Sequence, residues 1–140
     1  MSSHVILVYA AVKFLAYSAW CYLGLRSVRA AAGQVAMAIR LGAVRWALGL
    51  GFGIAVFLLI GSIDAEAVAR TYVLVYTPVR AVEWGIMIAL IARRASRVLT
   101  PGAAVTLGAW YVGGLLLSFA TDLLSPEGLQ GRFCVGRCLC

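Results

Sequence analysis

The chain has 140 residues, of which 64% are hydrophobic and 12% charged, and its formal net charge is +7 at pH 7. Soluble globular domains carry about 25% charged residues, because polar side chains have to cover their surface. This composition therefore excludes a soluble domain. We expect an all-α integral membrane protein with one membrane domain over residues 1–140, built as a four-transmembrane-helix bundle with short loops.

The first two membrane helices are predicted over residues 5–25 and 33–63. A transmembrane helix needs about 20 consecutive apolar residues, and only Lys13 interrupts the first segment. The apolar part of the second segment is uninterrupted after Arg45. We therefore place Arg40 and Arg45 at the membrane surface, where long arginine side chains can reach the headgroups.

The third and fourth helices are predicted over residues 67–92 and 103–124. The third segment carries Arg80 and Glu83 near its middle. The fourth is rich in glycine, alanine and leucine. Residues 125–140 follow it as a short tail that contains cysteines.

Basic residues are unevenly distributed between the predicted connections. The connections after the first and third helices hold most of the arginines and no acid: Arg26, Arg29, Arg40, Arg93, Arg94 and Arg97. Because cytoplasmic loops are enriched in Lys and Arg, we expect both termini to be extracytoplasmic. Abundant Ala, Gly, Val and Arg suggest a GC-rich bacterial genome and hence the bacterial inner membrane.

The positive charge also bears on partners. Arginines near the surface attract anionic lipid headgroups, at about 1 kcal/mol per residue. No basic stripe on a soluble module is present to bind nucleic acid, so nucleic acid is not an expected partner. The expected partners are an anionic lipid bilayer and either other membrane protein subunits or further copies of this chain.

The candidate site consists of three charged residues near the middle of the predicted spans. An unpaired charge at mid-membrane costs at least about 2.5 kcal/mol, so these side chains have to face protein or water. Arg80 and Glu83 are three residues apart on one helix face and can pair. Lys13 lies at a similar depth on the first helix. The sequence thus predicts an intramembrane cluster of Lys13, Arg80 and Glu83.

Tyrosines recur on the same helix faces as these charges. Tyr9 and Tyr17 flank Lys13 at spacings of four, and Tyr72 and Tyr76 precede Arg80 at the same spacing. Residues four apart share one face of a helix, so we expect the four tyrosines to line the cluster and satisfy its donors.

Two interpretations of this cluster remain open. In the first, Arg80 and Glu83 merely neutralise each other. In the second, the cluster is a site for an ion, a proton or an anionic substrate, as intramembrane ionisable groups often are. Its one excess positive charge favours an anion or a carboxylate-bearing ligand over a cation.

Small residues predict close helix contacts. Gly49 and Gly53 on the second helix are four residues apart. On the fourth helix, Gly108 follows Ala104 and Gly113 follows Ala109 at the same spacing. These positions serve either packing within the bundle or an interface with another copy or subunit.

The tail cysteines Cys134, Cys138 and Cys140 have three open interpretations. They can form a disulfide if the tail is extracytoplasmic, bind a soft metal of unknown identity, or stay free. Their spacing matches no strong zinc or cluster signature. No cofactor is predicted, and a bound lipid or pigment remains open.

Three functions are compatible with these features. The leading hypothesis is a noncatalytic accessory or scaffold subunit of a larger membrane assembly, because nearly all of the chain is membrane helix. The alternative is a small homo-oligomeric transporter or channel that uses the Lys/Arg/Glu cluster. A holin-like, membrane-active protein is the third. Enzymatic activity is least supported, since His4 is the only histidine.

Overall fold

A computed structural model describes residues 3–28, 33–60, 68–94 and 101–125. These residues form four α-helices: α1 (Ser3–Ser27), α2 (Gln34–Ile60), α3 (Val68–Ala92) and α4 (Pro101–Leu123). The expected helix bounds differ from these by a few residues at most. The prediction of an all-helical chain with four long helices is thereby confirmed.

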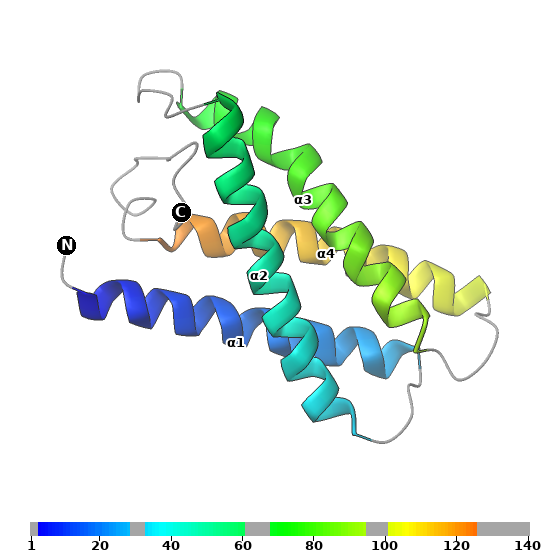
Figure 1. Cartoon of the computed structure of the whole chain (residues 1–140). Helices are drawn as coiled ribbons and strands as arrows, with labels where there is room; N and C mark the ends of the chain where they lie inside the picture. The colour runs from blue at the N-terminus through cyan, green and yellow to red at the C-terminus, as the bar shows by residue number, and fades with distance from the viewer. Residues whose placement is uncertain (1–2, 29–32, 61–67, 95–100, 126–140) are drawn as a thin grey trace.

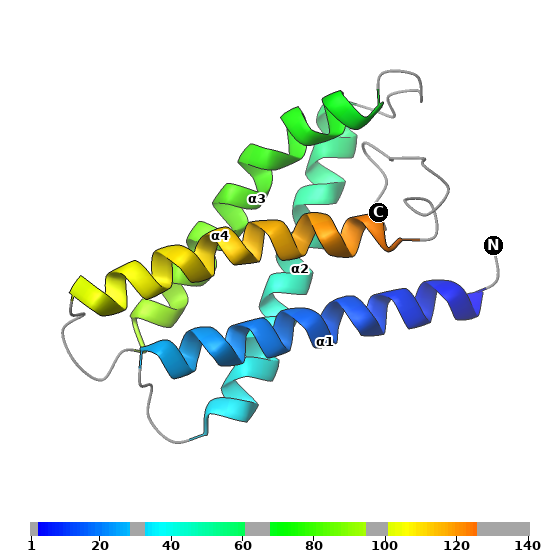
Figure 2. The ribbon, with the colours of Figure 1, turned by 180° about the vertical axis from the view of Figure 1, so that it is seen from behind.

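The helices form two crossed pairs. Helices α1 and α4 run antiparallel beside each other, and α2 and α3 form a second antiparallel pair that crosses the first steeply (Figures 1 and 2). The main contacts are α1 with α2 and α4, and α3 with α2 and α4. All four helices therefore meet near the middle of the molecule, where side chains from each can touch.

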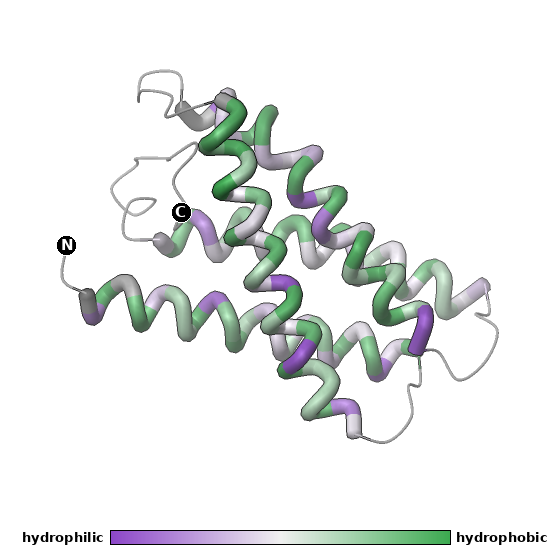
Figure 3. Tube along the Cα trace, in the orientation of Figure 1, coloured by the Kyte–Doolittle hydropathy of each residue, from purple (hydrophilic) through white to green (hydrophobic). Residues whose placement is uncertain are grey.

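Each helix is long and apolar enough to cross a membrane. The qualifying stretches are Leu7–Ser27, Gln34–Leu59, Arg70–Ala92 and Pro101–Leu123. Large apolar side chains cover the outer surface, with Leu59 84% and Leu58 75% exposed on α2 and Val105 74% exposed on α4. Hydrophilic positions interrupt the apolar helices near the middle of α1, α2 and α3 (Figure 3). Charged side chains thus lie inside the bundle while large apolar side chains lie on its surface, which is unusual for a water-soluble fold.

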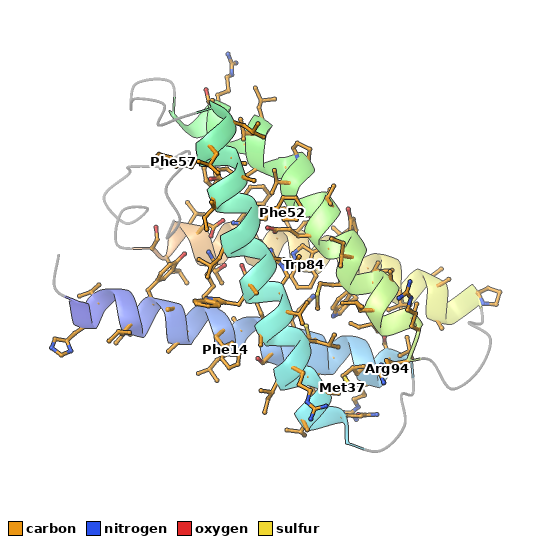
Figure 4. The ribbon with its side chains drawn as sticks, in the orientation of Figure 1. Phe14, Met37, Phe52, Phe57, Trp84 and Arg94 are labelled. Carbon is orange, nitrogen blue, oxygen red and sulfur yellow. The ribbon has the colours of Figure 1, made fainter. Side chains whose placement is uncertain are left out.

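The apolar core has two parts on either side of these polar positions. The larger cluster includes Cys21, Leu25, Leu41, Trp84, Met87, Ile91 and Trp110. The smaller one contains Val56, Tyr72 and Tyr76, with Phe119 packed against it. Trp84 lies where the helix pairs cross (Figure 4). The larger cluster fills the half of the bundle in which α1 and α3 end and α2 and α4 begin.

The glycines predicted to mediate helix packing lie in different environments. Gly113 packs against the indole ring of Trp20, and Gly53 is buried. Gly49 faces the charged side chains in the middle of the bundle. Gly108 is exposed, and a Cβ atom there would meet no other atom within 4 Å among the described residues. Gly108 therefore takes no part in packing within the described bundle.

Candidate functional site

Five ionisable side chains from the four helices form one network in the middle of the bundle. They are Lys13 on α1, Arg45 on α2, Arg80 and Glu83 on α3, and Asp122 on α4. The exposed fraction of these side chains is 11% for Lys13 and at most 5% for the others. Each helix contributes at least one charge, so the network joins the whole bundle.

Glu83 pairs with two arginines in the most deeply buried part of the network. Its Oε2 atom lies 2.7 Å from Arg45 Nη2 and 2.9 Å from Arg80 Nη1. Arg80 Nη1 also donates to Glu83 Oε1 at 3.3 Å. The side chains of Arg45 and Glu83 are both 0% exposed. Charge-assisted hydrogen bonds of this length are strong where water is excluded.

Asp122 pairs with Lys13 and Arg80 in the other part of the network. Its Oδ1 atom pairs with the Lys13 ammonium, and its Oδ2 atom accepts from Arg80 Nη2 at 2.9 Å. The Tyr72 hydroxyl donates to Oδ2 at 2.5 Å. Arg80 therefore bridges the two carboxylates, and Lys13 is joined to Glu83 through Asp122 and Arg80.

Positive and negative groups alternate along the network in the order Lys13, Asp122, Arg80, Glu83 and Arg45. With every group ionised, three cations face two carboxylates, which leaves one excess positive charge. An unbalanced charge is costly in a site this well shielded from solvent. The arrangement therefore favours the approach of one further negative charge.

Aromatic rings surround the cations. The Arg45 guanidinium carbon lies 4.7 Å from the ring centroid of Tyr17 and 5.0 Å from that of Trp84. Arg80 lies 5.6 Å from the Tyr76 ring. The Tyr9 hydroxyl accepts from the Lys13 ammonium at 3.0 Å. Ring faces attract cations without neutralising them, so these contacts hold the positive groups in place and preserve their charge.

Ser118 on α4 ties the network to the aromatic core. Its hydroxyl oxygen accepts from Arg45 Nη2 at 3.0 Å and from the Trp84 indole nitrogen at 2.9 Å. Two donors from two other helices thus converge on one small side chain, which fixes the position of the Arg45 guanidinium.

Some buried donors in and beside the network lack a partner within the described residues. They are Arg45 Nε, Arg45 Nη1, Arg80 Nε and the Tyr17 hydroxyl. A buried donor without an acceptor costs about 1–3 kcal/mol. Three of these four atoms belong to guanidinium groups, so the site has spare donor capacity beside its excess positive charge.

The network contains two members that the sequence interpretation had not assigned to it. Arg45 was expected at the membrane surface, but its side chain is fully buried, because it lies on the inner face of α2 and contacts Glu83 and Ser118. Asp122 falls inside the predicted fourth span and is its only acid. Its spacing of four from Ser118 places both on one face. That polar face was the available signal for Asp122.

The four tyrosines and the cysteines have distinct positions. Tyr9, Tyr17, Tyr72 and Tyr76 are all buried beside the network. Cys21 is a free, buried thiol. Cys134, Cys138 and Cys140 lie outside the described residues, so the disulfide and metal predictions stay predictions. The described residues contain no group of three His, Cys, Asp or Glu side chains that could hold a metal ion.

Comparison with known proteins gives no assignment. No protein-family model, curated protein or solved structure matches this chain significantly. The function is therefore argued from the charged network and from the surfaces of the four helices.

Proposed function

We propose that this chain is an integral membrane protein, a small transporter or channel, and that the five-residue network is its site for an anionic solute. Four helices of spanning length support the membrane assignment. The buried charges support the site, because ionisable groups inside membrane spans are expensive and commonly line ion or substrate paths.

The main observation behind this proposal is that Arg45 is buried while some of its hydrogen-bond donors have no acceptor among the described residues. Its side chain is 0% exposed, yet its Nε and Nη1 atoms have no acceptor among the described residues. It also belongs to a network with one cation more than its carboxylates balance. An anionic group placed against Arg45 would satisfy the donors and remove the charge imbalance together.

A purely structural role fits these features less well. Buried ion pairs can often be replaced by packed apolar residues with no loss of stability. A network that served stability alone would gain nothing from a third cation, since each carboxylate already pairs with Arg80. The excess charge is more useful to a protein that has to attract a solute.

The distribution of polar and apolar groups suggests a path. Lys13 is the most exposed member of the network and lies in the N-terminal half of α1, whereas Arg45 and Glu83 are fully buried. Beyond them the larger apolar cluster, with Leu25, Leu41 and Ile91, closes the other half. A solute entering past Lys13 would meet alternating charges down to Arg45, and further passage would need the apolar half to open.

The proposed orientation places both termini on the extracytoplasmic side of a bacterial inner membrane. Exposed arginines support it. Arg26, Arg40, Arg93 and Arg94 lie in the helix halves next to the first and third connections, which the positive-inside rule assigns to the cytoplasm, whereas Arg70 is the exposed arginine at the start of α3.

A second candidate, an accessory subunit of a larger membrane assembly, is favoured by the outer face of α4. Ala104 and Gly108 are exposed and four residues apart, which is the pattern of close helix contacts in membranes. The same face would also serve self-association of a transporter. Mass measurement after gentle extraction separates the two: a fixed ratio to larger subunits supports the accessory role, and a homo-oligomer supports the transporter.

The test of anion transport uses purified protein in liposomes loaded with potassium chloride. Valinomycin releases the counter-ion, and a chloride electrode records efflux. We expect efflux from the wild-type protein and a loss of at least about tenfold, or 1.4 kcal/mol, in Arg45→Gln. That change removes the excess cation and leaves Glu83 paired with Arg80, so the protein should still fold.

Arg40→Gln is the matched control, because Arg40 lies on the same helix but is exposed. It should pass chloride like the wild type. Absence of efflux from well-folded wild-type protein, or equal efflux in both variants, would refute the proposal. Helical content and elution volume verify folding in each case.

A further inference from the structure

The sequence of the chain repeats after 67 residues. On α1 the segment Leu7–Lys13 matches Leu74–Arg80 of α3 without a gap, with four identical pairs out of seven and a final pair of lysine and arginine. On α2 three half-buried apolar residues match their counterparts on α4 at the same separation: Leu48 and Leu115, Leu50 and Leu117, Phe52 and Phe119. Weak internal similarity of this kind marks structural repeats in membrane transporters. We call α1 with α2 the first repeat and α3 with α4 the second repeat.

The two repeats are arranged with approximate two-fold symmetry. Exchanging them turns the antiparallel pair α1–α4 into the pair α3–α2, and these are the two crossed pairs of the bundle (Figures 1 and 2). Equivalent side chains share their environment, since Tyr9 and Tyr76 are both buried. Lys13 Nζ lies 5.2 Å from the Tyr9 ring centroid. Its equivalent, Arg80, has Cζ 5.6 Å from the Tyr76 ring centroid.

Asp122 lies between two equivalent cations. Its Oδ1 atom pairs with the Lys13 ammonium, and its Oδ2 atom accepts from Arg80 Nη2 at 2.9 Å. A group that contacts both members of a symmetry-related pair lies close to the symmetry axis. Asp122 itself is not repeated, because Ala55 stands at its position in the first repeat.

Arg45 lies between two equivalent rings. Its Cζ atom is 4.7 Å from the ring centroid of Tyr17 and 5.0 Å from that of Trp84, which lies 67 residues later. Arg45 is not repeated either, since Val112 stands at its position in the second repeat. Two like charges close to one axis would repel each other. The line from Asp122 to Arg45 therefore follows the axis between the repeats.

The charges that join the repeats are complementary. The first repeat contributes two cations to the network, Lys13 and Arg45, and the second contributes both carboxylates, Glu83 and Asp122. Arg80 holds the two carboxylates together within the second repeat. Coulomb attraction decreases slowly with distance, so the ion pairs between the repeats can hold them together while their relative angle changes.

One end of the interface between the repeats is closed by Trp20 and Trp110, which belong to the larger apolar cluster or pack against it. Trp20 Nε1 donates to the Trp110 carbonyl at 3.1 Å, and Trp110 Nε1 donates to the Trp20 carbonyl at 2.7 Å. Both carbonyls lie inside helices, where a backbone N–H four residues later also reaches them. Parting the two rings therefore leaves no carbonyl without a donor, so this contact can break and form again.

We propose that the two repeats rock against each other around the charged network, so that the two ends of the bundle open in turn and the solute passes along the line from Asp122 to Arg45. The inference rests on the proposed transport of an anion, for which it states the movement. Transporters built from repeats commonly rock as rigid bodies around a site at the repeat interface. With the contact between Trp20 and Trp110 made, the described bundle is closed toward the first and third connections.

The experiment measures distances between two nitroxide spin labels in the purified full chain in liposomes, by double electron–electron resonance. Each pair joins equivalent, exposed positions of the two repeats: Leu7→Cys with Leu74→Cys at one end, and Arg26→Cys with Arg93→Cys at the other. We expect two distances for each pair. Replacing sodium gluconate by sodium chloride should shift the populations at the two ends in opposite directions, because opening one end closes the other.

The matched control is Leu7→Cys with Leu59→Cys, because both positions are exposed and belong to the first repeat. This pair should give one distance that chloride leaves unchanged. All labelled variants carry serine in place of the three tail cysteines, Cys134, Cys138 and Cys140. The buried Cys21 should stay unlabelled.

A second variant tests the movement without chloride. Trp20→Phe removes the indole donor of one of the two bonds to Trp110. It should raise the population of the longer distance between the labels at Arg26 and Arg93 at least about twofold, because the closed end loses a hydrogen bond.

Three results would overturn the inference: distances that neither chloride nor Trp20→Phe changes, shifts of the same sign at both ends, or an equal shift in the control pair. Chloride efflux from liposomes tests the proposed function separately. Efflux from a protein whose distances stay fixed would refute the rocking and keep the transporter. Opposite shifts at the two ends, in a protein without efflux, would keep the rocking and refute transport.

Discussion

Arg45 and Glu83 form an ion pair in which Nη2 and Oε2 are 2.7 Å apart, and both side chains are fully shielded from solvent. The pair joins α2 to α3, which run antiparallel beside each other (Figure 1). Glu83 also accepts from Arg80, and Arg80 pairs with Asp122. A substitution at one end of the network can therefore shift side chains on all four helices.

Because the network carries an excess positive charge, removing one of its carboxylates should destabilise the fold more than removing one of its cations. Asp122→Asn leaves Lys13 and Arg80 facing each other without their shared carboxylate, and we expect a loss of about 3–5 kcal/mol of unfolding free energy. Lys13→Met removes the excess charge and leaves Asp122 paired with Arg80 and Tyr72. Its cost should be about 1.5–3 kcal/mol, the typical loss for a hydrogen bond to a charged group, because the bond to Asp122 is lost together with the weaker one to Tyr9.

Unfolding in a detergent titration, followed by circular dichroism, measures both values. Arg93→Met is the control, because Arg93 is exposed, and its effect should stay within about 0.5 kcal/mol. A larger loss in Lys13→Met than in Asp122→Asn would show that the network does not carry an excess positive charge.

The helices were predictable because hydrophobic length alone determines a membrane span. The long apolar runs predicted segment bounds close to those of the four helices. The pairing of Arg80 with Glu83 was equally accessible, since residues three apart on a helix are neighbours whatever the tertiary fold.

The rest of the network depends on contacts between helices, which no local pattern encodes. Arg45 lies at the start of an apolar run, where the sequence alone fits a surface arginine as well as a buried one. Only its contacts with Glu83 and Ser118 on other helices show that it is buried. Asp122 lies near the end of α4, where an acid is usually solvated. Only the antiparallel contact of α1 with α4 brings it to Lys13.

Replacing Ser118 by alanine should lower the stability of the protein, although the side chain is small. Ser118→Ala removes the acceptor of the Trp84 indole nitrogen and one of the two acceptors of Arg45 Nη2, which keeps Glu83. A buried donor left without an acceptor costs about 1–3 kcal/mol. Near-ultraviolet circular dichroism should report a changed Trp84 environment. Thr106→Ala is the control, because the Thr106 hydroxyl makes only an exposed local bond to Gly102. Equal stability of the two variants would contradict the role given to Ser118.

Replacement by alanine should destabilise the protein at Gly114 but not at Gly108. A Cβ at Gly114 would lie 2.7 Å from Trp84 Cδ2, whereas one at Gly108 would meet nothing within 4 Å among the described residues. Overpacking of this kind costs about 1–3 kcal/mol. We therefore expect a lower melting temperature for Gly114→Ala and an unchanged one for Gly108→Ala. A stable Gly114→Ala protein would mean that the Trp84 ring can move aside.

The outer face of α4 can be tested for self-association with a larger side chain. Gly108→Leu should leave the fold intact, because Gly108 is exposed, but should keep a neighbouring helix from close approach. Native mass spectrometry from detergent should then show smaller assemblies than the wild type. Gly51→Leu, at an exposed glycine on α2, is the control and should not change the mass. Identical masses in all three proteins would exclude this face as the interface.

The proposed orientation makes a final prediction about labelling. Three helices separate His4 from Arg94, and both residues are exposed. If each helix crosses the membrane, the two positions lie on opposite sides. We replace Cys134, Cys138 and Cys140 by serine and keep Cys21, whose thiol is fully buried and should not react.

In this background a membrane-impermeant maleimide should label His4→Cys in intact cells and Arg94→Cys only after lysis, because the arginine-rich connection beside Arg94 is retained in the cytoplasm. The parent with Cys21 alone should stay unlabelled in both conditions. The reverse pattern would invert the orientation without affecting the membrane assignment. Labelling of both positions from the same side would contradict three crossings, and with them the path proposed from Lys13 to Arg45.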